Sequence, residues 1–292
     1  MAKFAGVTRP AGKRGRPSKA ELALRAVAAR KTDETPAERV RRIAERFGVM
    51  YKLAQGSIAG NVRGLVISGA PGVGKSHTIK HLLEQAKERG DINFRAVSGT
   101  ITPINLYKLM YQFQKEKDVL LLDDTDSIYD DEESMNLLKA GLDSNERRMI
   151  SWLSETNALK SEGIETSFEY KGSMIFITNK DLQTAAILDK SRIAVHYRAL
   201  MDRAVYLDLK LHTADDVMAW IAYMVRAHGI LIQRGLSKGQ QEDVVLWVQK
   251  NYEQIPMLSL RLMNKVADFV NTFPADWESM ARITAFADDP RI

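Results

Sequence analysis

Short apolar runs alternate along the chain with stretches in which apolar residues recur every three or four positions. The runs are typical of buried parallel strands, and the stretches are typical of amphipathic helices. Five runs follow residue 60, at 62–68, 92–97, 118–124, 172–179 and 204–209. A helical stripe precedes the first run, and it begins at a capping box formed by Thr35 and Glu38. This order predicts an α/β fold built on a five-stranded parallel sheet.

A second set of helical stripes follows the fifth run. Start signals at Thr213 and Ser237 predict the first two helices, because serine and threonine satisfy the exposed N–H groups of a first turn. The predicted helices cover 213–228, 238–251, 259–272 and 276–286. No strand-like run interrupts them, so we expect a small all-α domain at 211–292 after a sheet domain at 34–210.

Charge sets the first residues apart from the rest. Residues 1–31 contain nine lysines and arginines but one acid, Glu21, whereas the whole chain has a net charge of +5. A strongly basic arm is therefore attached to a slightly acidic body. The first half of the arm is rich in glycine, proline and charge and has no apolar period, so the arm at 1–33 is predicted to be mostly disordered.

The arm contains a short motif in which arginine alternates with glycine. Its candidate DNA-binding residues are Lys13, Arg14, Gly15, Arg16, Pro17 and Lys19. The Arg-Gly-Arg-Pro segment resembles an AT-hook, which lies in the minor groove of A·T-rich DNA. A narrow minor groove has a strong negative potential that attracts arginine, and glycine permits close approach. The alternatives are a basic tail that contacts phosphates without preference, and a solubilising tail that binds nothing.

A glycine-rich segment follows the first apolar run and precedes a helical stripe at 77–89. It fits the pattern G-x-x-x-x-G-K-[ST] in the strand, loop and helix context that a P-loop needs. Successive backbone N–H groups and the start of the helix would surround phosphate oxygens, while the lysine reaches the outer phosphates and the serine hydroxyl binds Mg²⁺. The candidate nucleotide-binding residues are Gly69, Pro71, Gly72, Val73, Gly74, Lys75, Ser76 and His77.

The third and fourth apolar runs also end in polar residues. Asp123 and Asp124 close the third run in the Walker B pattern, and Asn179 closes the fourth. The carboxyl ends of parallel strands meet at one edge of a sheet, beside the glycine-rich loop. We therefore expect the Ser76 hydroxyl to bind Mg²⁺ and Asp123 to bind it through water. Asp124 is the candidate carboxylate for activating water. The alternatives are that Asp126 takes part, or that both residues belong to a polar loop without a catalytic role.

The order of these motifs resembles the AAA+ ATPases, in the branch of clamp loaders, helicase loaders and phage replication ATPases. The resemblance covers about 34–285 and leaves the arm outside. It implies a P-loop NTPase core of five parallel strands followed by a helical lid. It also implies ATP and Mg²⁺ as cofactors, and a homo-oligomeric ring or arc, expected to be a hexamer, with sites between subunits.

The resemblance further implies roles for individual residues. Asp124 stands where the family usually has glutamate, which is one methylene longer, and Asn179 stands at the sensor 1 position. Arg203, just before the fifth strand, is the implied finger for the neighbouring subunit, with Arg198 as second choice and a surface ion pair as the alternative. Arg261 stands at the sensor 2 position, with a solvated helix face as its alternative.

Two features have more than one interpretation. The segment 145–171 is longer than a simple connection and contains basic and aromatic residues. It either faces a central pore and grips nucleic acid, or forms a β-ribbon packed on the sheet. Ahead of the first strand, Phe47, Met50 and Tyr51 either contact the nucleotide base or pack in the core.

The sequence therefore predicts a Mg²⁺-dependent ATPase that loads or remodels a replication or recombination complex on DNA, with a replication protein as partner. The alternatives are a helicase or translocase similar to superfamily 3, and a slow ATP-binding switch anchored to DNA. An unfoldase is disfavoured because no aromatic-glycine pore loop follows the second strand. The chain has no cysteine and no apolar run long enough to span a bilayer, so we expect no membrane partner and a cytoplasmic location, that of the host for a phage-encoded protein.

Overall fold

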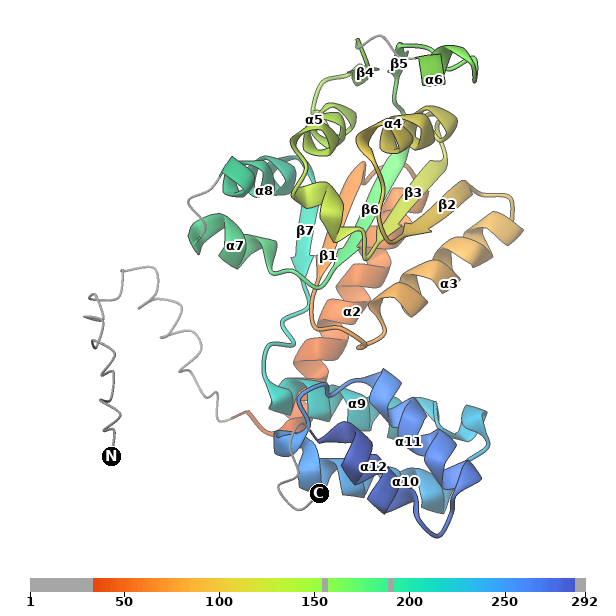
Figure 1. The fold of residues 1–292 in the computed structure, drawn as a ribbon, viewed down its shortest axis with the longest axis vertical. Coiled ribbons are helices and arrows are strands. Elements are labelled where there is room, and N and C mark those ends of the chain that lie inside the picture. The colour runs from red at the N-terminus through yellow and green to blue at the C-terminus, as the bar shows by residue number, and fades with distance from the viewer. Residues whose placement is uncertain (1–33, 154–156, 189–191, 287–292) are drawn as a thin grey trace, which may run out of the picture. The chain divides into compact units, whose positions relative to one another are not determined.

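The computed structural model describes residues 34–153, 157–188 and 192–286, which belong to one compact unit (Figure 1). The predicted basic arm, its predicted disorder and its AT-hook-like residues lie outside the described residues. Within the described ranges, no helix has both the length and the apolar character needed to cross a membrane.

Five parallel strands form the central sheet, as the apolar runs predict (Figure 1). Their order across the sheet is β2-β3-β6-β1-β7, and each neighbouring pair is parallel. The strands are β1 (Gly64–Ser68), β2 (Asn93–Ser98), β3 (Asp118–Asp123), β6 (Ser173–Thr178) and β7 (Val205–Asp208). Every residue of β1, β3 and β6 is buried, which explains why these strands read as continuous apolar runs.

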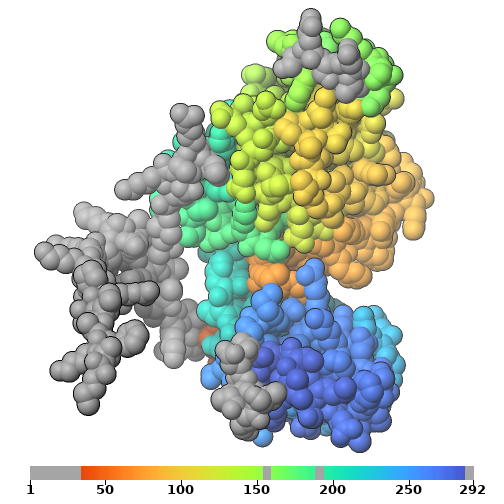
Figure 2. Space-filling model, viewed as in Figure 1, coloured from red at the N-terminus to blue at the C-terminus, as the bar shows by residue number. Residues whose placement is uncertain are grey.

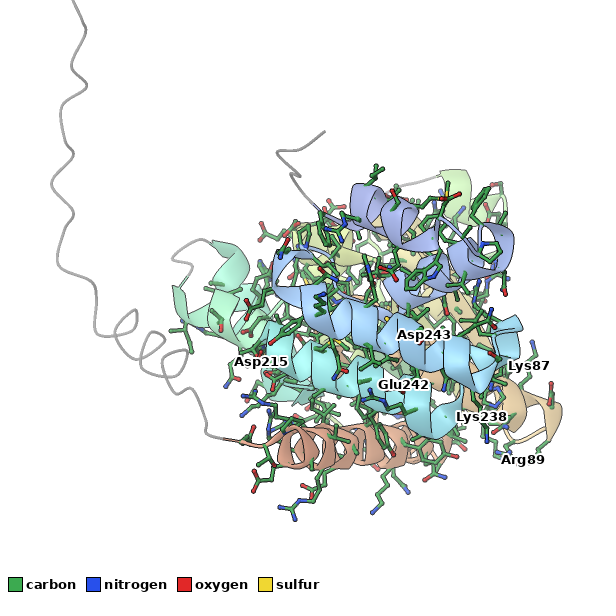
Figure 3. All side chains as sticks on the ribbon, turned by 90° about the horizontal axis from the view of Figure 1, so that it is seen from below. Lys87, Arg89, Asp215, Lys238, Glu242 and Asp243 are labelled. Atoms are coloured by element: carbon green, nitrogen blue, oxygen red, sulfur yellow. The ribbon has the colours of Figure 1, made fainter. Side chains whose placement is uncertain are left out.

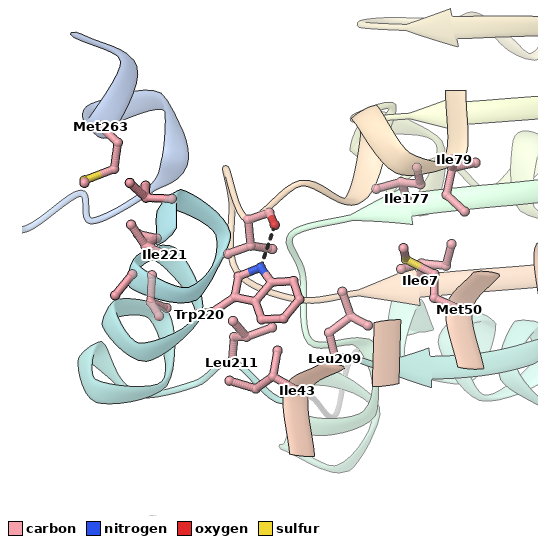
Figure 4. Packing of buried hydrophobic residues seen from close by; sticks show 14 of the residues in the cluster. Ile43, Met50, Ile67, Ile79, Ile177, Leu209, Leu211, Trp220, Ile221 and Met263 are labelled. Carbon is pink, nitrogen blue, oxygen red and sulfur yellow. Dashed lines mark hydrogen bonds between the residues drawn. The ribbon is translucent and has the colours of Figure 1, made fainter. Parts of the chain in front are cut away.

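Helices cover both faces of the sheet because successive strand side chains point to opposite sides. Leu65 and Ile67 of β1 pack with α2 (Pro36–Ile58) and α3 (Lys75–Glu88) in one hydrophobic cluster. Val66 belongs to a second cluster with α4 (Pro103–Gln112), α5 (Glu132–Gly141) and α8 (Arg192–Arg203). Figure 4 shows part of the first cluster, where Ile67 lies among side chains of neighbouring elements.

Two predicted helix bounds differ from the structure. Helix α2 continues to Ile58, beyond the predicted end near residue 51, because buried Ala54 and Ser57 extend its packed face. The predicted single helix at 182–201 is instead α7 (Leu182–Leu188) and α8, with residues 189–191 outside the description. The two helices pack on each other, and Arg198 of α8 donates a hydrogen bond to the Ala186 carbonyl at 3.0 Å. A straight helix could not bring these residues together.

The long insertion forms a β-ribbon, as in the second of its two interpretations, and the ribbon packs on α4 and α5. Strands β4 (Met149–Ser151) and β5 (Ser167–Glu169) pair antiparallel on either side of a short helix, α6 (Asn157–Lys160). Arg148, one of the basic residues considered for gripping nucleic acid, is buried and donates to the carbonyls of Gly141 and Gly172 at 2.9 and 3.2 Å. Arg148 therefore stabilises the base of the ribbon, and whether the ribbon lines a pore stays a prediction.

The C-terminal part is helical, as expected. Helices α9 (Ala214–His228), α10 (Lys238–Asn251), α11 (Leu260–Thr272) and α12 (Trp277–Ala285) match the predicted ranges to within two residues. Short 3-10 turns lie at Asp126–Tyr129, Ile232–Arg234 and Tyr252–Gln254. Glu242 of α10, labelled in Figure 3, accepts a hydrogen bond from Arg226 of α9 at 2.6 Å.

The helical part joins the sheet through a continuous hydrophobic cluster and an ionic contact. The cluster that contains Leu65 also contains Trp220 and Met263 of the helical part. Between α2 and α9, Arg39 and Arg42 donate to the buried Asp216 carboxylate at 3.0 and 2.7 Å. The helical part forms its own lobe in Figure 2. The division into domains at residues 34–210 and 211–292 stays a prediction, since the core runs across it.

Candidate functional site

The glycine-rich loop lies between the carboxyl end of β1 and the start of α3. Gly72 and Gly74 have φ angles of +67° and +106°, which side chains of L-residues rarely tolerate. Gly74 is the N-cap of α3, and no side chain caps the first turn there. The loop therefore presents unpaired backbone N–H groups at the positive end of a helix dipole, an arrangement that suits a phosphate group.

A cavity of about 620 Å³ opens beside this loop. Asp124, Asn179 and Arg261 line it together with the loop residues Gly72, Val73, Gly74, Lys75, Ser76 and His77. Strand order explains the meeting, because β1, β3 and β6 place their carboxyl ends on the same sheet edge. Gly69 and Pro71, two other predicted residues, do not line this cavity, although Pro71 lines a second one of about 850 Å³.

Lys75 is buried at the centre of the site. Its Nζ donates hydrogen bonds to the carbonyls of Gly69 and Ala70 at 2.7 and 2.8 Å and to Oδ1 of Asn179 at 2.9 Å. Burial lowers the pKa of Lys75 to about 8, although the carboxylates of Asp124 and Asp123 oppose the shift. Neutral partners hold the ammonium in place, and they are groups that a charged phosphate oxygen can replace.

The predicted metal ligands contact each other directly. The Ser76 hydroxyl donates to Oδ1 of Asp123 at 2.7 Å, and Asp123 is 4 % exposed at the end of β3. Hydroxyl and carboxylate oxygens are the hard donors that Mg²⁺ prefers, so this pair fits that ion. Lys80, which the sequence analysis did not single out, places its Nζ 2.7 Å from Oδ2 of Asp123. Its spacing of four residues from Ser76 on α3 is the signal that was missed.

Asp124 adopts a left-handed backbone conformation, with φ of +53°. Its N–H donates to the Ile177 carbonyl at 3.1 Å, and its Oδ1 accepts from Nδ2 of Asn179 at 3.0 Å. The two bonds turn the carboxylate toward the amide at the end of β6. Asp126, the alternative carboxylate, accepts instead from the Thr178 hydroxyl at 2.7 Å and does not line the cavity.

The three candidate arginines lie in different places. Arg261 is the second residue of α11 and lines the cavity, and the neighbouring Leu260 N–H donates to the Gly72 carbonyl at 2.8 Å. Arg203 is exposed at the end of α8, where it donates to the Ala199 carbonyl at 3.1 Å, and it does not line the cavity. Arg198 is directed to α7. Arg261 therefore lies at the cavity beside the loop, whereas Arg203 lies away from the cavity of its own subunit.

At the apolar end of the cavity, the sequence analysis considered Phe47 but missed Trp220. Trp220 of α9 stacks on Phe47 with ring centroids 4.4 Å apart, and its Nε1 donates to the Val73 carbonyl at 3.0 Å, a bond dashed in Figure 4. Of the three residues considered for base contact, Phe47 lines the cavity, Met50 is core and Tyr51 is exposed. A buried tryptophan in an amphipathic helix reads as ordinary core, so its role needed the structure. The remaining lining residues are Thr78, Met224, Ile230, Gln233, Arg234, Leu260 and Asn264.

The close approach of α11 to the loop predicts an unusual sensitivity at Gly72. A Cβ added there would lie 2.7 Å from Cβ of Ser259, whereas one added at Gly60, whose φ is +80°, would meet nothing within 4 Å. We expect Gly60→Ala to cost about 1 kcal/mol of unfolding free energy through backbone strain, and Gly72→Ala at least about 1 kcal/mol more. Urea unfolding followed by circular dichroism measures both, and equal losses would refute the proposed contact.

Comparison with known proteins places this geometry in a family. The family model described as "ATPase family associated with various cellular activities (AAA)" matches residues 65–199. The chain is also 35% identical over 264 residues to an uncharacterized 36.7 kDa protein of Enterobacteria phage T4, from the nrdC-mobD intergenic region. That match covers 90% of this chain and 80% of the T4 protein.

Solved structures are similar more distantly. The RuvB Holliday junction branch migration motor of Thermotoga maritima shares 13% identity and a TM-score of 0.46, covering 83% of this chain and 68% of that one. A DNA replication initiation factor shares 14% identity and a TM-score of 0.46, covering 82% and 64%. Likenesses of this strength inform neither the substrate nor the partners of this chain. By its P-loop geometry and by the family match over residues 65–199, the protein contains an AAA domain and is a P-loop ATPase.

Proposed function

We propose that the protein is a Mg²⁺-dependent AAA+ ATPase that hydrolyses ATP at interfaces between subunits and acts on DNA or DNA-bound complexes. Loading or remodelling of a replication or recombination complex, with a replication protein as partner, is the specific role that we infer. The observation that supports hydrolysis most strongly is that Lys75, Asp124, Asn179 and Arg261 all line one cavity at an uncapped helix start.

Binding of the phosphates depends on the loop and on Lys75. The N–H groups from Gly72 to His77 would surround the phosphate oxygens, and the Lys75 ammonium would exchange its carbonyl partners for them. This exchange is favourable because a charged acceptor forms a stronger hydrogen bond than a neutral carbonyl. The stacked rings of Phe47 and Trp220 would form a flat apolar wall for the base at the other end of the cavity.

Ser76 and Asp123 would hold Mg²⁺, which supplies positive charge at the outer phosphate oxygens when bound. Asp124 would accept a proton from the attacking water as general base, and Asn179 would hold both the carboxylate and that water in line. A left-handed conformation at a non-glycine residue costs about 1–3 kcal/mol, so the backbone at Asp124 is held there by its surroundings. Arg261 would stabilise negative charge on the γ-phosphate from the same subunit.

Arg203 would act on the site of a neighbouring subunit. It is exposed at the end of α8 and does not line its own cavity, as a residue supplied to another subunit requires. Hydrolysis then depends on a homo-oligomer, a ring or arc that we expect to be hexameric. Because the arm is strongly basic and the body slightly acidic, we assign DNA contact to the arm. The residues that would lie in the minor groove of A·T-rich DNA are Lys13, Arg14, Gly15, Arg16, Pro17 and Lys19.

A slow ATP-binding switch anchored to DNA is the second candidate function. It is favoured by the short Asp124 side chain and by the hydrogen bonds that join Asp124, Asn179 and Lys75 into one chain. In this chain the Asp124 carboxylate accepts a hydrogen bond from the Asn179 amide, so that oxygen is not available to a water molecule. Fast turnover of ATP by the purified protein would eliminate this candidate.

Nucleotide affinity should depend on pH through Lys75. Its pKa is about 8 in the free protein, and bound phosphates raise it, so binding takes up a proton above that pH. Affinity is therefore full below about pH 8 and falls as the pH rises, by up to about tenfold per unit. Titration with a fluorescent ATP analogue at several values from about pH 7 to 9.5 measures this. The control is Lys75→Ala, which should bind the analogue weakly and with an affinity that does not change with pH. A constant wild-type affinity would contradict the assignment.

Action on DNA is tested by the rate of ATP hydrolysis with and without single- and double-stranded DNA. We expect stimulation by DNA in the full-length protein. Arg14→Ala with Arg16→Ala should abolish a preference for A·T-rich duplex, because these side chains are assigned to the minor groove. Arg25→Ala with Arg30→Ala, which removes the same charge elsewhere in the arm, should only weaken binding. No stimulation and no DNA binding would refute the proposed role on DNA.

A further inference from the structure

Lys80 holds the acid that is proposed to bind the metal. Its Nζ lies 2.7 Å from Oδ2 of Asp123, while the other carboxylate oxygen accepts from the Ser76 hydroxyl at 2.7 Å. The Asp123 side chain is 5% exposed and that of Lys80 is 36% exposed. Both oxygens of a buried carboxylate are therefore engaged, one of them by a cation on a partly solvated stem.

We propose that Lys80 is a built-in counter-ion that stands in for Mg²⁺ at Asp123 and releases the carboxylate when the metal binds. Lys80 then determines how strongly ATP binding depends on Mg²⁺. The inference rests on the Mg²⁺-dependent function proposed above and adds a regulating residue to that site.

The buried carboxylate explains why such a counter-ion exists. A carboxylate removed from water is unfavourable unless a positive charge or several hydrogen bonds compensate it. Lys75 attracts Asp123 only through space, because its Nζ is bonded to Gly69, Ala70 and Asn179. Lys80 contacts the carboxylate directly, and its side chain is long and accessible enough to withdraw into solvent.

The same charge should oppose the metal. The Lys80 ammonium occupies one oxygen of the carboxylate that is proposed to hold the metal, and it would repel a divalent cation bound beside it. Without the metal, the ammonium would instead favour the negatively charged nucleotide. Without Lys80, nucleotide should bind more weakly in EDTA and more tightly in Mg²⁺. Both changes raise the ratio of the Kd for nucleotide in EDTA to the Kd in Mg²⁺. Removing the charge at residue 80 should raise this ratio.

The experiment measures both Kd values by fluorescence, with a non-hydrolysable fluorescent ATP analogue and full-length protein. For Lys80→Met we expect the ratio to rise about fivefold or more, the size of a partly solvated charge effect. Lys80→Gln should behave similarly, and Lys80→Arg, which keeps the charge, should stay within about twofold of the wild type. Lys87→Met is the matched control, because Lys87 lies on the same helix over the Phe94 ring, 5.6 Å from its centroid.

The outcomes separate this inference from the function beneath it. A wild-type ratio near one would overturn the Mg²⁺ assignment and the inference together. A high wild-type ratio that Lys80→Met and Lys80→Gln leave unchanged would overturn the inference alone. A lower ratio in both variants would show that Lys80 supports the metal instead of competing with it, and would overturn the inference as well. An equal rise of the ratio in Lys87→Met would show that the effect comes from general surface charge, and it would also overturn the inference.

Discussion

Two hydrogen bonds to the backbone of the glycine-rich loop connect the helical part of the molecule to the nucleotide site. Leu260 N–H donates to the Gly72 carbonyl, and Trp220 Nε1 donates to the Val73 carbonyl. The glycines of the loop adopt positive φ angles, which other residues rarely adopt. A movement of the loop would therefore displace the hydrogen-bonding partners at the start of α11 and on α9. The Leu260–Gly72 bond lies next to Arg261, which lines the cavity.

The polar groups of the site are already organised before any ligand contact is considered. Lys75, Asn179 and Asp124 form one hydrogen-bonded chain, and Ser76 and Lys80 share the two oxygens of Asp123. Preorganised groups of this kind lose little free energy to reorientation when the transition state forms. The cost is that each must exchange a protein partner for a ligand atom. Under the proposed function, ligand binding requires Lys80 and Asn179 to release these partners.

The sequence was informative wherever a local pattern determines the structure. Strands buried on both faces leave continuous apolar runs, and helices leave caps such as Thr213 and Ser237, so the sheet and the C-terminal helices were predicted closely. The loop was equally clear because phosphate binding demands a fixed spacing of glycine, lysine and serine.

What escaped prediction depends on contacts between distant segments. The stacking of Trp220 on Phe47 joins residues 173 positions apart and leaves no local signal. The division of one predicted helix into α7 and α8 comes from their packing on each other. The Asp123–Lys80 ion pair joins a strand end to a helix, and the only sequence signal for it is the four-residue spacing of Lys80 from Ser76. The roles assigned to Arg203, Arg261 and Asp124 stay predictions, since they concern chemistry and a neighbouring subunit.

The central claim is that each subunit holds one half of an ATPase site and that a neighbour completes it through Arg203. Mixing Asp124→Asn protein with Arg203→Ala protein tests this most directly. Each variant alone should hydrolyse ATP far more slowly than the wild type, since each lacks one part of every site. In an equal mixture, about a quarter of interfaces combine an intact Asp124 with an intact neighbouring Arg203, so up to about a quarter of wild-type turnover should return. A mixture no faster than the average of its two components would contradict the shared site.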